Sequence, residues 1–105
     1  MPSPQQIERF TLAFHRVAVE HLRRQPALRR QALAVLDRWE SGAAALQANS
    51  YRDCWRVLLA GEIDSLERAV CVDTERAATL RSMSPLGFVL EEPERLRIRR
   101  EAMSP

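Results

Sequence analysis

The sequence predicts an all-α fold, a small bundle of four to five helices with an extended C-terminal strap. Glycine occurs only three times in 105 residues, whereas Ala, Leu, Arg and Glu, which favour helices, are frequent. Apolar residues recur at three- and four-residue spacing along most of the chain, and prolines and glycines interrupt that pattern. A chain of this length forms a single domain with a modest core.

The first helix is expected to begin at Pro4 and to end near Gln25. Ser3 suits the N-cap, Pro4 the first helical position, and Gln6 completes a capping box with Ser3. One apolar stripe follows at helical spacing, formed by Ile7, Phe10, Phe14, Val17, Ala18, His21 and Leu22. Pro26 then stops this helix and can open the next one, which Gly42 would end.

Three shorter helices are expected after a connection, at 43–48, that reads as either a short helical turn or a loop. They cover Tyr51–Ala60, Ile63–Val70 and Glu75–Arg81, with N-cap candidates at Ser50 and Thr74. The shared periodicity predicts a core of Phe10, Phe14, Val17, Leu33, Leu36, Trp39, Trp55 and Leu58.

The end of the chain differs from the rest. Ser84-Pro85 stops helix propagation and Gly87 loosens the backbone, so the apolar run Leu86–Leu90, called the strap below, lies outside the helices. Beyond Pro93 either a helical turn or an extended tail fits the sequence. We therefore divide the domain into a bundle, 1–81, expected to fold alone, and a partner-binding segment, 82–105, of strap and basic tail. The strap could instead fold back over a groove of its own bundle.

Charge is unevenly distributed although the net charge is only +2. Seven arginines and three acidic residues up to Arg38 give +4, the segment 39–92 carries −4, and the remainder +2. All basic residues are arginines, whose planar guanidinium makes bidentate contacts with carboxylates and phosphates. Arg23, Arg24, Arg29 and Arg30 crowd the first interhelical turn, as a solvated corner or as an anion-recognising surface.

No residue pattern for catalysis is found, so we predict no enzyme, no cofactor and no catalytic or metal-ligating residues. Phosphate-binding, dinucleotide-binding and nucleophile-elbow motifs are missing. His15 and His21 are six residues apart and do not share a helix face, so packing or surface roles are expected. Cys54 and Cys71 are expected to be free, buried thiols in a reducing cytoplasm. A signal peptide and a membrane-spanning run are also missing.

Apolar anchors beside a row of arginines suit docking on an acidic protein cleft. The predicted partner-binding residues are Leu86, Phe88, Val89, Leu90, Arg95, Arg97, Arg99, Arg100, Arg23 and Arg24.

Four segments between Phe14 and Arg100 carry a family resemblance. These are Phe14-His15-Arg16-Val17-Ala18, the tryptophan-bearing segments 36–39 and 51–59, and the late stretch 80–90 followed by Arg95. The chain resembles small all-helical bacterial antitoxins with a late S-x-x-S-P-[FL]-x-x-V-L stretch, which it matches from Ser84 to Leu90. It is similar in particular to the antitoxin-like chaperone of a zeta-toxin-like type III effector, a P-loop kinase.

This resemblance implies a cytoplasmic antitoxin or chaperone that neutralises a cognate toxin by stoichiometric binding in a hetero-oligomeric complex. The alternative is a DNA-binding regulator of its own operon, acting through the arginines near the first turn. We expect DNA binding by the chain alone to be weak, because the net charge is small. A third alternative is a dimeric structural protein without a toxin partner.

Overall fold

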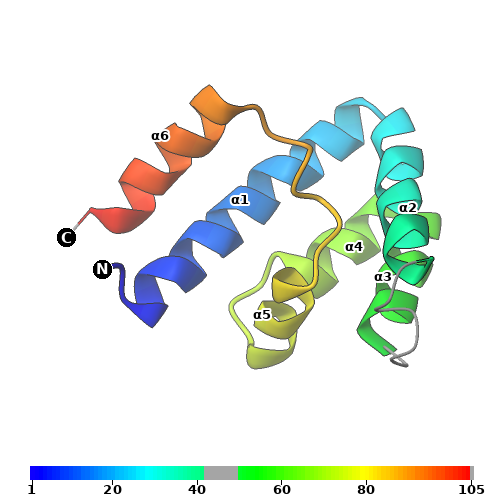
Figure 1. Cartoon of the computed structure of the whole chain (residues 1–105), viewed down its shortest axis with the longest axis horizontal. Coiled ribbons are helices and arrows are strands. Elements are labelled where there is room, and N and C mark those ends of the chain that lie inside the picture. Colours follow the sequence, from blue (N-terminus) through cyan, green and yellow to red (C-terminus); the bar gives the residue numbers. More distant parts are fainter. Residues whose placement is uncertain (42–49, 105) are drawn as a thin grey trace.

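The computed structural model describes residues 1–41 and 50–104, and within them the chain is all-helical (Figure 1). Six helices are present in this described part: α1 (Pro4–Arg24), α2 (Ala27–Glu40), α3 (Ser50–Ala60), α4 (Ile63–Val70), α5 (Glu75–Ser82) and α6 (Glu92–Met103). None of them is both long and apolar enough to span a lipid bilayer.

The start of α1 follows directly from its first residues. The Ser3 hydroxyl accepts a hydrogen bond from the Gln6 backbone N–H at 3.1 Å, and the Gln6 side-chain oxygen accepts from the Ser3 N–H at 2.8 Å. The predicted capping box is therefore confirmed. At the other end the helix stops before Pro26, and the Gln25 N–H donates to the His21 carbonyl.

Helix α1 is the spine of the fold and packs against α2, α4, α5 and α6. In Figure 1, α6 runs back beside α1 in the opposite direction, so both chain ends lie at the same end of the molecule. The Gln6 side-chain amide donates to the Met103 carbonyl at 3.3 Å and joins the two ends.

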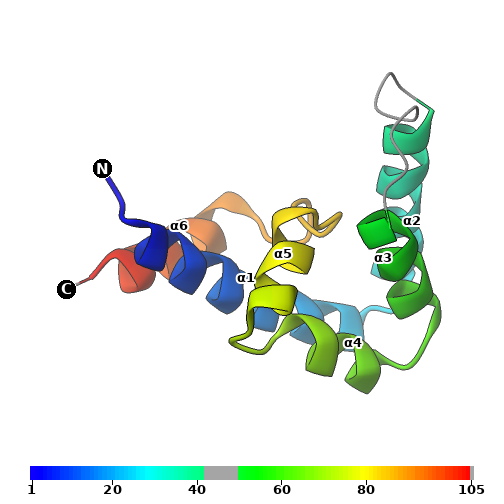
Figure 2. The same ribbon diagram turned by 90° about the horizontal axis from the view of Figure 1, so that it is seen from below.

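Most of the residues that the sequence predicts for the core are found there. Phe14, Leu36 and Trp55 are buried, and four more pack against them half-buried: Phe10, Val17, Leu33 and Leu58. Trp39 was predicted as a core residue and this is wrong, since 38% of it is exposed. Figure 2 shows that α2 and α3 project together from the layer of the other helices. Trp39 belongs to the last turn of α2.

The basic tail is the helix α6, one more helix than the four or five predicted. Of the two alternatives for the tail, the helical one is observed, over 12 residues rather than a single turn. Pro93 lies in its first turn, where its missing N–H costs nothing, and Glu92 and Glu94 complement the helix dipole. Ile98 and Ala102, four residues apart, form the buried face against α1.

The strap is not helical, but its two ends pack on the bundle. Leu86 is 0% exposed and Leu90 3% exposed, and both belong to the main core. The hydrophobic core is thus continuous past Arg81 into the segment that the sequence assigns to partner binding.

Candidate functional site

The strap presents one large apolar side chain to solvent. Leu86 and Leu90 anchor it, and the Val89 N–H donates to the Leu86 carbonyl at 3.0 Å, closing a turn. Phe88, within this turn, is 39% exposed, and Val89 is half-buried. Of the four predicted apolar contact residues, two are therefore internal anchors and two face outward at least in part.

Phe88 and Val89 line a depression of about 500 Å³, called the Phe88 groove below, where the strap meets the α1–α2 corner and the start of α6. Leu28 contributes an apolar side chain from α2, and Arg97 lies on the α6 side. Across it the His21 Nε2 lies 3.0 and 3.1 Å from the two Glu94 carboxylate oxygens, a contact that joins α1 to α6.

The arginines of α6 have different positions. The Arg95 guanidinium lies over the Phe14 ring, 5.6 Å from its centroid, and donates to the Gly87 carbonyl. Arg95 thus holds the strap against α1. Arg97, Arg99 and Arg100 are exposed and make no ion pair with any residue that the structure describes.

Of the four arginines at the α1–α2 turn, two bond within the chain and two are exposed. Arg23 donates to Asp64 at 2.8 Å and to Glu67 at 3.1 Å, which ties α1 to α4. The hydrogen bond from Arg23 lowers the pKa of Asp64 below its usual value. Arg29 donates to the Gly61 carbonyl at 2.7 Å. Arg24 and Arg30 remain exposed, without a carboxylate partner in the described chain.

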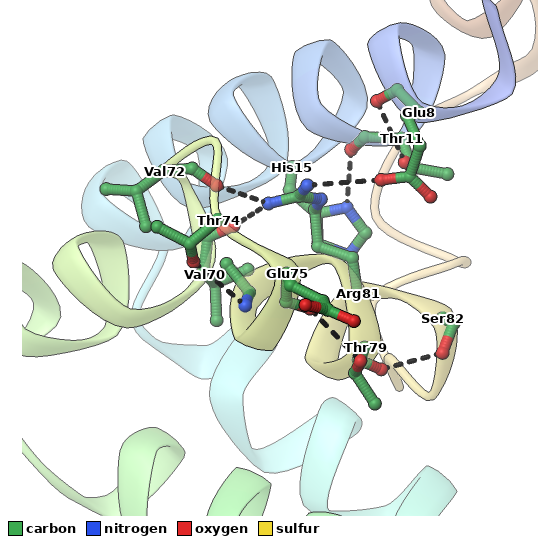
Figure 3. A network of polar contacts seen from close by, with 11 residues as sticks. Glu8, Thr11, His15, Val70, Val72, Thr74, Glu75, Thr79, Arg81 and Ser82 are labelled. Atoms are coloured by element: carbon green, nitrogen blue, oxygen red, sulfur yellow. Dashed lines mark hydrogen bonds and ion pairs between the residues drawn. The ribbon is translucent and has the colours of Figure 1, made fainter. Parts of the chain in front are cut away.

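A buried polar network between α1 and α5 has no clear signal in the sequence (Figure 3). The Arg81 guanidinium donates to the Val70 and Val72 carbonyls at 2.7 and 2.8 Å and lies 3.5 Å from the Glu8 carboxylate. The His15 Nδ1 lies 2.7 Å from the Thr11 carbonyl. Arginine near the end of a helix usually extends into solvent, so the periodicity gives no reason to place Arg81 inside.

Thr11, His15 and Arg81 of this network also line a second depression of about 200 Å³, called the His15 pocket below. Its lining comes from α1, the end of α5, the strap and α6: Phe10, Thr11, Phe14, His15, Arg81, Ser84, Gly87 and Arg95. The strap thus separates two depressions, with Gly87 lining the His15 pocket and Phe88 the Phe88 groove.

Both cysteines are free thiols; Cys71 is buried and Cys54 half-buried. Burial raises the pKa of the Cys71 thiol to about 11, so it stays protonated near neutral pH. Across the described residues, His, Cys, Asp and Glu side chains do not gather in any set of three or more suited to a metal ion.

A comparison with protein-family models, with curated proteins and with solved structures finds no match to this chain. Function is therefore inferred from the strap and its surroundings.

Proposed function

We propose that the chain is a stoichiometric binding protein of the antitoxin or chaperone type, which neutralises a partner protein by covering its active surface. The observation that carries the proposal is the exposed Phe88 side chain, held in a fixed turn between the buried anchors Leu86 and Leu90. The chain itself performs no catalysis in this proposal.

The anchored strap favours binding in two ways. Aromatic side chains that enter a partner pocket are typical hot spots, and burying one contributes about 1.5–3 kcal/mol. Because the strap ends are already packed in the core, little further chain entropy is lost when Phe88 meets a partner.

The exposed arginines around the Phe88 groove favour a partner with acidic groups at the rim of the interface. The groove itself is lined by Arg97 and by two glutamates, Glu91 and Glu94, of which Glu94 contacts His21. Arg24 lines an adjoining depression that shares His21 and Glu94 with the groove. Arg99 and Arg100 lie further along α6 and are exposed. These arginines could pair with carboxylates at the rim of the interface and steer encounter.

The roles of the predicted contact residues are accordingly divided. Phe88 and Val89 form the apolar contact, and four arginines form the charged rim: Arg24, Arg97, Arg99 and Arg100. Leu86, Leu90, Arg95 and Arg23 position these groups through contacts inside the chain.

The proposed partner is a cognate toxin or effector in the same cytoplasm, bound in a hetero-oligomeric complex. A zeta-toxin-like P-loop kinase is the partner that the sequence resemblance implies. The alternative function, regulation of DNA, would use the arginines at the α1–α2 turn, of which Arg23 and Arg29 are engaged within the chain.

Co-expression with the product of the neighbouring reading frame tests the proposal. Phe88→Asp should abolish protection of the cells and co-purification of the two proteins, because a carboxylate replaces the apolar anchor. Val57→Asp is the matched control, since Val57 is an apolar residue of α3 that is 72% exposed and lies outside the Phe88 groove. Both variants should keep the wild-type circular dichroism. Full protection by a folded Phe88→Asp variant would refute the proposal.

A further inference from the structure

The charged side chains that line the Phe88 groove differ in whether they are paired. Glu94 contacts His21 at 3.0 and 3.1 Å. Glu91 and Arg97 also line the groove, are exposed, and make no ion pair with any residue in the described part of the chain. Glu91 precedes α6, and its side chain does not cap that helix. The groove thus presents one carboxylate and one guanidinium that are available to another molecule.

This balance of charge determines which surface fits the groove. A purely acidic surface would pair with Arg97 but would meet the like charge of Glu91, and a purely basic surface would have the reverse problem. A surface that carries one acidic and one basic group satisfies both residues. In a two-fold symmetric dimer residue i meets residue j of the other copy and j meets i, so the same groove on a second copy supplies this pattern.

The uncharged lining of the groove is also complementary to itself. Gln25 and Gln31 carry primary amides, which both donate and accept hydrogen bonds and can therefore pair with an amide of the same kind. Leu28 and Val89 add apolar surface, and the Phe88 side chain, 39% exposed, is apolar surface that a partner can bury. Each copy therefore offers both a depression and an aromatic side chain to fill it.

We propose that the Phe88 groove binds a second copy of this chain in a two-fold symmetric dimer. Phe88 of each copy enters the groove of the other, and Glu91 of each copy pairs with Arg97 of the other. Ten described residues line the groove, whereas each side of a standard stable interface contributes about 20–30 residues. The dimer is therefore weak and forms only at high protein concentration.

Such a dimer covers Phe88 and competes with the partner protein for the same surface. Dimerisation would shield the exposed aromatic side chain until the partner is bound, and a weak dimer gives way to a tighter complex. This competition rests on the proposed function, whereas the dimer itself does not.

The test is sedimentation equilibrium of the whole chain at concentrations of about 5 to 500 µM, a range that covers weak association. The wild type should pass from monomer to dimer as the concentration rises. Glu91→Arg and Arg97→Glu should each weaken the dimer about tenfold or more, because each change brings like charges together. Glu101→Arg and Arg9→Glu are controls with the same changes of charge at exposed positions outside the groove, and should leave the dimer unchanged.

An equimolar mixture of Glu91→Arg and Arg97→Glu tests the pairing itself. In a mixed dimer the two introduced residues have opposite charges and face each other, and so do the two unchanged residues. The mixture should therefore dimerise as the wild type does, although neither variant does so alone. A wild type that stays monomeric at every concentration would overturn the proposal and leave the groove to the partner protein. A wild-type dimer that neither variant weakens, or a mixture that does not restore it, would also overturn the proposal.

Discussion

The indole Nε1–H of Trp55 donates a hydrogen bond of 2.9 Å to the backbone carbonyl of Leu80. The contact ties α3 to the last turn of α5, and both side chains are buried, at 0% and 1% exposure. Trp55 is thus the largest core side chain and also satisfies a polar atom inside the fold.

Replacement of Trp55 should be the most damaging single change in the core. Trp55→Ala removes the ring and is expected to cost about 3–5 kcal/mol of unfolding free energy. Trp55→Phe should cost less, about 1–2 kcal/mol, because a ring remains and the Met83 N–H still donates to the Leu80 carbonyl. Urea denaturation measures both. A loss below 1 kcal/mol for Trp55→Ala would contradict the buried position of Trp55.

Removal of residues 82–105 should unfold the bundle, contrary to the expectation from the sequence that 1–81 folds alone. The truncated chain lacks Leu86, Leu90 and Ile98 from the core, and the apolar stripe of α1 loses the helix α6 that covers it. Circular dichroism should show a strong loss of helix and no cooperative urea transition. A control that lacks only Ser104 and Pro105 should unfold as the wild type does. A truncated chain with near-native helix content and a cooperative transition would show that 1–81 folds alone.

Lowering the pH from 7 to 5 should lower the free energy of unfolding of the protein because of His15. Burial holds the folded-state pKa near 4, against an ordinary value of 6.5. The unfolded state therefore binds the proton first as the pH falls. The contribution of neutral His15 to the free energy of unfolding is fully present above about pH 6.5 and is lost as the pH falls toward 4. About 2 kcal/mol of unfolding free energy is lost between pH 7 and pH 5.

The variant His15→Phe isolates this effect. It retains Glu8, Arg81, His21 and Glu94, so the difference in pH dependence between wild type and variant belongs to His15. Urea midpoints at several pH values between 5 and 7 measure it. Identical slopes for the two proteins would show that folding does not lower the pKa of His15.

DNA binding by the isolated chain should be weak. Of the four arginines at the α1–α2 turn, Arg23 pairs with carboxylates and Arg29 donates to the Gly61 carbonyl. Arg24 and Arg30 therefore remain for DNA, and the net charge is +2. Fluorescence titration at about 0.15 M salt should give no dissociation constant below about 1 µM, the limit of ordinary non-specific binding. A tighter complex that is lost in an Arg24→Gln, Arg30→Gln double variant would support the regulator instead.

Local features of the fold are readable from the sequence. The capping box of Ser3 and Gln6, the stop before Pro26 and the end of α3 at Ala60 depend on a few neighbouring residues, and the sequence predicts their positions correctly. Trp39 and Trp55 follow apolar stripes of the same kind, yet only Trp55 is buried. Periodicity identifies a helix face but not whether another helix covers it, so the difference could not be predicted.

The candidate site depends more than the helix ends do on contacts between segments that are distant in the sequence, and such contacts are harder to predict. Arg23 pairs with Asp64 and Glu67, more than forty residues away, and this pairing has no signature in either segment. The burial of Arg81 is likewise determined by the carbonyls of Val70 and Val72 at the end of another helix. The sequence predicts correctly that the strap is not helical. It predicts an extended segment, however, where the structure has a turn closed by Leu86 and Val89, and it does not show which side chains of the strap face the core.

The pairing of α1 with α6 has a consequence for synthesis of the chain. Among the described helices α1 leaves the ribosome first, and α6, which lies along it, leaves last. During translation the apolar stripe of α1 therefore stays partly uncovered until α6 has emerged from the exit tunnel. The nascent chain exposes this stripe to aggregation while the four helices between them are made, and α1 is fully covered only after α6 has docked.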